Sequence, residues 1–326
     1  MRRRLVLPVL VLSMAAQLAG AEDLTLAKAD YPEGPLWHRL RLYYAEMMRD
    51  RIVVSRDLRT TATFWEMPQC GPVSIAPYRD DELLVLCHLI HRIVRVSLSG
   101  VTLGIIDHDD GGRSLVHPND SSADDKGGVY FTASGEFSLS APATGAVLYL
   151  DRRGTLRRLA EGIRYANGIA VDSPRHRVLV SEHLNRRVLT FPLRADGRLG
   201  KPAVFFDLNK LVLPRVDLDP LAGPDGLELD TTGRLVIAEY GAGRIHLVGS
   251  NGGWLGTLRG LKKYVTDVAL LPGGQAAVTE AEVNDVPPFP GDVVILDRFL
   301  SRFERPGHQG PRQSQISTMT VARMRR

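Results

Sequence analysis

The chain has 326 residues, with 41 Lys and Arg against 37 Asp and Glu and a formal net charge of +4. The excess of positive charge comes from Arg2–Arg4 and from residues 301–326, so the body between them is mildly acidic. A mildly acidic body without a basic stripe argues against a nucleic-acid partner. The composition is 44% hydrophobic with 31 Gly and 20 Pro, which predicts a large core and many turns.

Residues 1–21 predict a secretory signal. They combine a basic start, an apolar run and the small-residue ending Ala19-Gly20-Ala21, as cleaved signal peptides do. We expect cleavage after Ala21 and a periplasmic or secreted protein, with an uncleaved membrane anchor as the alternative. No later stretch approaches the roughly 18 apolar residues of a spanning helix, so we expect no membrane span after cleavage.

The rest of the chain repeats one pattern six times. Each copy predicts a strand, a turn and a second strand, over residues 35–46, 73–88, 119–133, 167–182, 225–239 and 267–280. A third strand follows every copy, and a fourth follows five of them. The sixth copy lacks its fourth strand, which the N-terminal segment 23–30 can supply.

Four-stranded repeats of about 40–50 residues predict an all-β fold, a six-bladed β-propeller over residues 22–300 whose last blade is closed by the N-terminal strand. A sandwich or a solenoid is the alternative, although a solenoid would lack the closing strand. Residues 301–326 have no periodicity and several arginines, which predicts a basic, disordered tail.

The innermost strand of each propeller blade begins at the mouth of the central channel. Aligning the copies predicts that these residues lie there: Glu33, Val73, Asn119, Asn167, Asp225 and Asp267. Five of the six carry a side-chain oxygen, the hard donor that Ca²⁺ or Mg²⁺ takes, and the lack of Cys and His disfavours zinc. Converging carboxylates need a cation or dense hydrogen bonding. The alternative is that each Asn-Gly or Asp-Gly merely begins a strand after a turn.

Four motifs within residues 31–281 resemble those of the SMP-30/gluconolactonase family of six-bladed propellers. They are PEGPLW at 32–37, PND at 118–120, ANGIAVD at 166–172 and GPDGLELD at 223–230. The resemblance implies one divalent ion on the axis, usually Ca²⁺, with Mg²⁺, Mn²⁺ or Zn²⁺ also possible. It implies that the ligands are Glu33, Asn119, Asn167 and Asp225.

The resemblance also implies hydrolysis of a small lactone or ester. The ion would polarise the carbonyl group, with Asp225 as the general base for a water molecule or, alternatively, as a direct nucleophile. Two other classes stay open: a strictosidine-synthase-like or arylesterase-like propeller enzyme, and a non-catalytic binding propeller with a structural ion.

Substrate contacts are expected at the same mouth. Many family members carry an arginine two residues before the second ligand, where this chain has His117, as a substrate contact or an ordinary turn residue. Because histidine is mostly neutral at pH 7, the change puts a sugar acid lactone in doubt. Segments 133–144 and 208–222 should overhang this face with apolar walls, and Glu136 is a further candidate substrate contact.

The ends of the second strands predict a second polar column at this face: Glu46, His88, Ala133, Glu182, Glu239 and Glu280. We interpret the glutamates as bonding to a neighbouring blade's backbone. His183, beside Glu182, is a candidate substrate contact and proton shuttle, or simply a solvated loop residue.

Cys70 and Cys87 flank the hairpin of the second copy. An exported protein permits a disulfide between them, and two buried thiols are the alternative. Hairpin symmetry about residues 80–81 places Cys70 opposite residue 90 or 91 rather than Cys87, so the spacing leaves both possibilities open.

Overall fold

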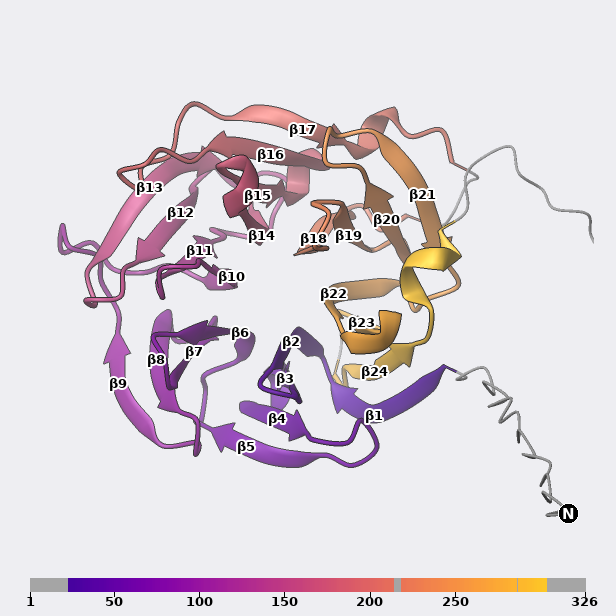
Figure 1. The fold of residues 1–326 in the computed structure, drawn as a ribbon, viewed down its shortest axis with the longest axis horizontal. Coiled ribbons are helices and arrows are strands. Elements are labelled where there is room, and N and C mark those ends of the chain that lie inside the picture. Colours follow the sequence, from indigo (N-terminus) through magenta and orange to yellow (C-terminus); the bar gives the residue numbers. More distant parts are fainter. Residues whose placement is uncertain (1–22, 214–217, 286, 304–326) are drawn as a thin grey trace, which may run out of the picture.

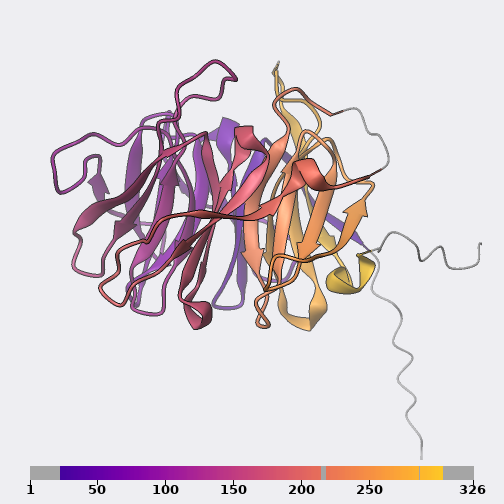
Figure 2. The same ribbon diagram turned by 90° about the horizontal axis from the view of Figure 1, so that it is seen from above.

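The computed structural model describes residues 23–303 except 214–217 and 286. The predicted signal peptide 1–21 and residues 304–326 of the predicted tail lie outside the described residues. The described chain forms six four-stranded antiparallel sheets arranged around one axis (Figure 1). Their strands run between two loop-bearing faces (Figure 2). The prediction of a six-bladed β-propeller is confirmed.

The first five blades each use four consecutive strands. In blades 1 to 3, from the axis outward, the strands are β2 (Pro32–His38), β3 (Arg41–Glu46), β4 (Arg51–Ser55), β5 (Ala62–Glu66); β6 (Pro72–Tyr78), β7 (Glu82–Cys87), β8 (Arg92–Ser97), β9 (Thr102–Ile106); and β10 (Pro118–Ala123), β11 (Val129–Ala133), β12 (Gly145–Leu150), β13 (Leu156–Ile163). In blades 4 and 5 they are β14 (Ala166–Asp172), β15 (Arg177–Glu182), β16 (Arg187–Pro192), β17 (Ala203–Asp207); and β18 (Gly223–Leu229), β19 (Leu235–Tyr240), β20 (Arg244–Val248), β21 (Trp254–Arg259).

Blade 6 joins the two ends of the described chain: β22 (Tyr264–Leu270), β23 (Ala276–Ala281), β24 (Pro290–Leu296) and β1 (Leu24–Asp30). Short 3-10 helices are η1 (Met47–Arg49), η2 (Ser173–Arg175), η3 (His183–Asn185), η4 (Leu208–Lys210), η5 (Pro272–Gly274) and η6 (Phe299–Arg302). Among the residues that the structure describes, no helix is long and apolar enough to cross a membrane.

The predicted closing strand is β1. It pairs antiparallel with β24, where Lys28 lies opposite Asp292 and its Nζ is 2.9 Å from that carboxylate. After β24, Arg302 donates two hydrogen bonds to Asp23, at 2.6 and 2.7 Å. The N-terminal strand therefore closes the ring as predicted, and the folded body continues through Arg302, which the sequence analysis assigned to the tail.

The hydrophobic core lies between neighbouring blades. Middle strands such as β7, with the sequence ELLVLC, are buried along their whole length because blades cover both of their faces. Outer strands such as β5 and β9 keep one side exposed. Between blades 2 and 3, Leu84 and Leu86 pack in one cluster with Phe131 and Leu148. Burial of each such side chain stabilises the folded state by about 1.5–3 kcal/mol, so the packed blades hold the residues at the axis in place.

Cys70 and Cys87 form a disulfide, with their Cα atoms 4.6 Å apart. Hairpin symmetry holds from Tyr78, opposite Glu82, to Ser74, opposite Leu86. A register shift then places Pro72 opposite Cys87, and positive φ angles at Gln69 and Gly71 turn the chain back toward β7. The symmetry argument failed to select the bridge because it assumed an unbroken ladder.

Candidate active site

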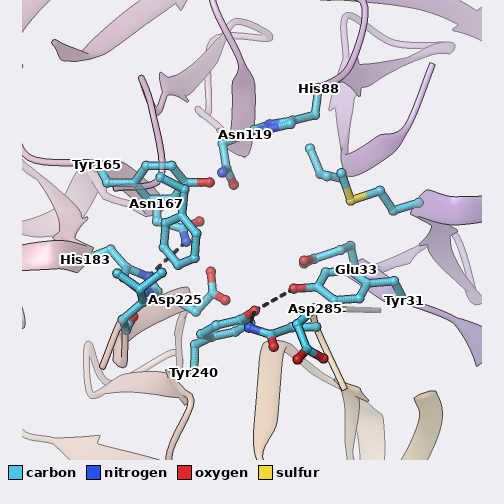
Figure 3. A pocket seen from close by; sticks show the side chains of 15 residues that line it. Tyr31, Glu33, His88, Asn119, Tyr165, Asn167, His183, Asp225, Tyr240 and Asp285 are labelled. Atoms are coloured by element: carbon cyan, nitrogen blue, oxygen red, sulfur yellow. Dashed lines mark hydrogen bonds between the residues drawn. The ribbon is translucent and has the colours of Figure 1, made fainter. Parts of the chain in front are cut away.

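A cavity of about 340 Å³ lies at one end of the propeller axis and is called the mouth cavity below (Figure 3). It is lined by Tyr31, Glu33, Met47, Val73, His88, Asn119, Phe137, Tyr165, Asn167, His183, Leu221, Asp225, Tyr240, Asn284 and Asp285. The four predicted metal ligands come from β2, β10, β14 and β18 of different blades. Their side chains face one another in the cavity.

The same backbone irregularity positions all four predicted ligands. The residue before each ligand pairs with the last or next-to-last residue of the neighbouring second strand, as Pro118 does with Ala133 and Pro224 with Glu239. The register then shifts across the ligand in blades 3, 4 and 5, and directly after the ligand, Glu33, in blade 1. A bulge of this kind redirects the side chain, so the ligands converge although they are far apart in the sequence.

Glycine follows the ligand in blades 1, 4 and 5 because the next blade packs against it. A Cβ added to Gly34 would lie 2.5 Å from the Val73 carbonyl oxygen, and one added to Gly168 would lie 2.1 Å from that of Asp225. A Cβ on Gly226 would lie 1.8 Å from Oδ1 of Asp267. The Glu-Gly, Asn-Gly and Asp-Gly pairs of the motifs therefore combine a ligand with a close approach between blades.

The predicted sixth member of the ring, Asp267, is displaced by one residue. Val265 pairs with Glu280, and the register shifts directly after it, so Thr266 holds the ligand-equivalent position. Thr266 donates to the Pro32 carbonyl at 2.8 Å. Asp267 instead lines a second cavity of about 280 Å³ further along the innermost strands, called the channel cavity below. The sequence alignment matched oxygen-bearing residues and so missed the register.

The two buried carboxylates of the mouth cavity, Glu33 and Asp225, have no cationic partner among the described residues. Burial raises the pKa of Glu33 well above its usual range, and the nearby Asp225 raises it further. Burial likewise raises the pKa of Asp225, with a further contribution from Asp120 and an opposing one from Asn167. Among the described residues, no Lys or Arg forms an ion pair with either carboxylate. A bound divalent cation would compensate both charges.

The donor set fits a hard cation. Among the described residues, no three His, Cys, Asp or Glu side chains form a group that could hold a metal ion. The predicted ligands are a different kind of set, since they combine only two carboxylates with the amides of Asn119 and Asn167. Carboxylate and amide oxygens are the donors that Ca²⁺ prefers, whereas zinc sites favour sulfur and imidazole nitrogen.

His183 lines the cavity and fixes the orientation of Asn167. Its Nδ1 accepts from the Asn167 amide nitrogen at 3.2 Å, and its Nε2 bonds to the Leu221 carbonyl at 2.8 Å. Burial lowers the pKa of His183 to about 4, so the ring is neutral. Holding the amide nitrogen leaves the Asn167 oxygen for the cavity. Both ring nitrogens are engaged, which leaves neither one for the predicted proton shuttle.

The other two predicted substrate contacts do not line the cavity. His117 stacks behind His88, with ring centroids 4.8 Å apart, and its Nδ1 bonds to the Gly135 carbonyl at 3.0 Å. Glu136 is exposed, and its neighbour Phe137 lines the cavity in its place. Direct contact of His117 or Glu136 with substrate stays a prediction.

The glutamates of the second polar column do not line the cavity, whereas His88 of that column does. The carboxylates of Glu46, Glu182 and Glu239 each bond to the arginine that begins the next strand, at 2.8 Å for Arg244 and Glu239. The carboxylates of Glu182 and Glu280 also accept hydrogen bonds from backbone N–H groups, at 3.1 and 2.8 Å. These N–H groups lie in the connections from the preceding blades, which confirms for these two residues the interpretation that the glutamates bond to a neighbouring blade's backbone. The cavity is lined instead by residues that follow a second strand or end it: Met47, His88, His183 and Tyr240.

Tyr31 and Tyr165 are site residues that the sequence analysis missed. They occupy equivalent positions, two residues before Glu33 and Asn167, and both have positive φ, 49° and 57°. Their carbonyl groups accept from the N–H of Met47 and His183. His117 holds the same position in blade 3, with φ of 47°. Left-handed backbone at bulky residues marks local strain, which concentrates at functional sites.

Comparison with known proteins places this site in a family. The family model described as the SMP-30/Gluconolactonase/LRE-like region matches residues 31–279. The chain belongs to the SMP-30/gluconolactonase family. This confirms the resemblance drawn from the four motifs, which all fall within the matched region.

Individual members of the SMP-30/gluconolactonase fold are distant from this chain. Diisopropyl-fluorophosphatase of Loligo vulgaris is 23% identical over 189 residues, which cover 54% of this chain and 57% of that relative. A gluconolactonase structure from Xanthomonas campestris has a TM-score of 0.67 at 21% identity, covering 84% of this chain and 89% of its own. A calcium-binding protein, regucalcin, from Agrobacterium tumefaciens has a TM-score of 0.66 at 15% identity, covering 86% and 96%. At these identities the likeness of the two structures concerns the fold.

Proposed function

We propose that the protein is an exported, metal-dependent hydrolase of lactones or closely related esters. The observation that carries the proposal is the convergence of two buried carboxylates and two amides on one cavity at the propeller axis, without a cationic partner among the described residues. The family supports it, since the relatives include a gluconolactonase and a fluorophosphatase, both of which cleave a bond to an acyl or phosphoryl group.

One divalent ion, Ca²⁺ in the first place, would be held by Glu33, Asn119, Asn167 and Asp225. Oxygen donors with two negative charges suit it, and the calcium-binding relative supports the choice. When bound, the ion would polarise the ester carbonyl and stabilise the negative charge that develops on its oxygen.

Asp225 is the residue that we assign as general base. Its carboxylate would take a proton from a water molecule as the water oxygen forms a bond to the carbonyl carbon. The ester C–O bond then breaks, and the same proton passes to the leaving alkoxide, so that a lactone yields one hydroxy acid. Direct attack by Asp225 on the carbonyl carbon is the alternative.

A hydrolysis panel tests the proposal. The purified mature protein is stripped with a chelator and reloaded with Ca²⁺, Mg²⁺, Mn²⁺ or Zn²⁺, and acid release is followed with a pH indicator for lactones of several ring sizes and for aryl esters. We expect lactone hydrolysis that depends on metal. Preference for aryl esters would favour an arylesterase-like enzyme, and metal binding without any turnover would favour a binding propeller.

A second candidate substrate class has one supporting observation, the fluorophosphatase relative. Fluoride release from diisopropyl fluorophosphate, measured with an ion-selective electrode beside the lactone panel, separates the two classes. Faster fluoride release than lactone hydrolysis would make phosphorus esters the better assignment.

Export has its own test. The mature protein recovered from the periplasm or the medium should begin at Glu22, as measured by intact mass. Recovery of the full-length chain in the membrane fraction would support the uncleaved anchor.

A further inference from the structure

Aromatic side chains cover much of the wall of the mouth cavity. Tyr31, Phe137, Tyr165 and Tyr240 all line it. The Phe137 ring centroid lies 4.6 Å from that of Tyr165 and 6.1 Å from that of Tyr240, so the three rings form a continuous surface. The remaining apolar lining comes from Met47, Val73 and Leu221. The cavity therefore offers an extended apolar face beside its oxygen donors.

The aromatic and apolar part of this wall offers few hydrogen-bonding groups to a substrate that carries many hydroxyls. Both ring nitrogens of His183 are engaged, and His88 uses Nδ1 on the Pro118 carbonyl at 3.2 Å. Among the described residues that line the cavity, none is Lys or Arg. A sugar hydroxyl against this wall would lose its bonds to water without gaining a partner.

Two hydroxyls do supply one neutral donor. The Tyr31 and Tyr240 oxygens are 2.8 Å apart, and the Asn284 amide nitrogen donates to Tyr240 at 2.8 Å. The two hydroxyls carry two protons but share a single mutual bond. One proton is therefore left to donate to an ester oxygen of the substrate. A neutral donor of this kind matches an uncharged ester rather than an anion.

We propose that the mouth cavity selects an uncharged lactone or ester that carries an aromatic group, and that it discriminates against polyhydroxylated sugar lactones. The proposal rests on the proposed function. The aromatic group of the substrate packs against Phe137, Tyr165 and Tyr240 in edge or offset contacts. With the ion bound, an anionic substrate is still disfavoured because the exposed Asp285 lines the same cavity and no Lys or Arg is among the described residues that line it.

The test compares three six-membered lactones on the metal-loaded mature protein: δ-phenyl-δ-valerolactone, δ-valerolactone and glucono-δ-lactone. Each kcat/KM is divided by the uncatalysed rate constant at the same pH, which removes differences in intrinsic reactivity. We expect the normalised value to be about 10²-fold higher for the phenyl lactone than for the glucono lactone, with the bare ring between them.

A pair of variants in one loop links the preference to the wall. Phe137→Ser should reduce the advantage of the phenyl lactone over the bare ring by about 10-fold, mainly through KM. Leu139→Ser is the control, because Leu139 lies in the same segment, is 52% exposed and does not line the cavity. It should keep the wild-type ratio.

The two proposals fail in different ways. Preference for glucono-δ-lactone, or an unchanged ratio in Phe137→Ser, overturns the aromatic selectivity while leaving the hydrolase intact. Absence of turnover for all three lactones, with the ion bound, overturns the proposed function.

Discussion

The mouth cavity and the channel cavity both hold buried carboxylates on the propeller axis, but these carboxylates have different partners. In the channel cavity, Asp120 accepts from the backbone N–H of Ser121 at 2.7 Å and of Ile169 in the next blade at 2.8 Å. Asp267 accepts from the Val268 N–H at 2.7 Å. Asp120 therefore joins two blades, whereas the bond of Asp267 stays within its own strand, and each has a backbone donor.

The carboxylates of the mouth cavity have much less compensation. Glu33 and Asp225 each have one side chain as hydrogen-bond donor, Thr266 and Asn167 respectively, and neither has a basic partner among the described residues. Carboxylates of similar burial and charge therefore have different roles in the two cavities. Carboxylates that accept backbone N–H groups stabilise the fold, whereas those that face a lined cavity without such donors are suited to bind a cation.

The largest expected effect separates catalysis from metal binding within the mouth cavity. At saturating metal, Asp225→Asn should lose ~10²–10⁴ in turnover because it keeps an oxygen donor but loses the base. Glu33→Gln removes the same formal charge from another blade and should lose far less. Steady-state kinetics of the two variants decide the matter, and equal losses would make Asp225 a ligand only.

The next effect concerns metal affinity. Asn119→Ala should weaken binding by at least about 10-fold, since changes even in groups behind metal ligands cost 10–100-fold. Asn284→Ala is the matched control, an amide that lines the cavity outside the predicted ligand set. Titration calorimetry of both variants, with circular dichroism to check strand content, gives the comparison. Identical affinities for Asn119→Ala and wild type would remove Asn119 from the ligand set.

Metal removal should lower the melting temperature, increasingly so at higher pH. An ion at 100 times its dissociation constant adds about 2.7 kcal/mol to the free energy of unfolding. Burial raises the pKa of Asp120 to about 6 and that of Glu228 to about 7, and it raises those of Glu33 and Asp225 too. A carboxyl with a raised pKa contributes stability below the unfolded value, near 4, and loses it as pH rises through the folded value.

The chelated protein should therefore melt at progressively lower temperature between about pH 4 and pH 7, and the gain on adding Ca²⁺ should grow over that range. Melting curves with and without a chelator at several pH values measure this. A gain that is constant with pH would mean that the ion does not compensate these charges.

The smallest expected effect is on the channel cavity. Asp120→Asn should lower the free energy of unfolding by about 1–3 kcal/mol, because an amide replaces a carboxylate that accepts from two blades. Its metal affinity should change less than that of Asn119→Ala, although the two residues are adjacent. Denaturant unfolding and calorimetry on the same preparations test both parts, and a collapse of metal affinity would show that the two cavities act as one.

The sequence predicted the blades well because they repeat, and the same repeat identified the four predicted ligands that converge on the mouth cavity. The four ligands are accompanied by proline, glycine or a buried strand, and these neighbours reflect the bulge and the close packing between blades. The position of Asp267 was wrong because a register shift leaves no mark in the residue types. Phe137 was missed because the connection that carries it does not repeat from blade to blade, and Tyr31 was missed because the alignment of the copies began at the ligand, two residues later.

Ring closure by β1 has a consequence for the order in which the site is assembled. Tyr31 and Glu33 directly follow this strand, and the Tyr31 N–H donates to the Phe289 carbonyl of blade 6 at 2.9 Å. Strand β1 is synthesised first but can pair only when blade 6, which is synthesised last, is present. Contacts between residues so far apart in the sequence slow folding. Until that contact forms, Glu33 lacks its fixed position, so a nascent chain with only five blades would lack one of the four predicted ligands at the mouth cavity.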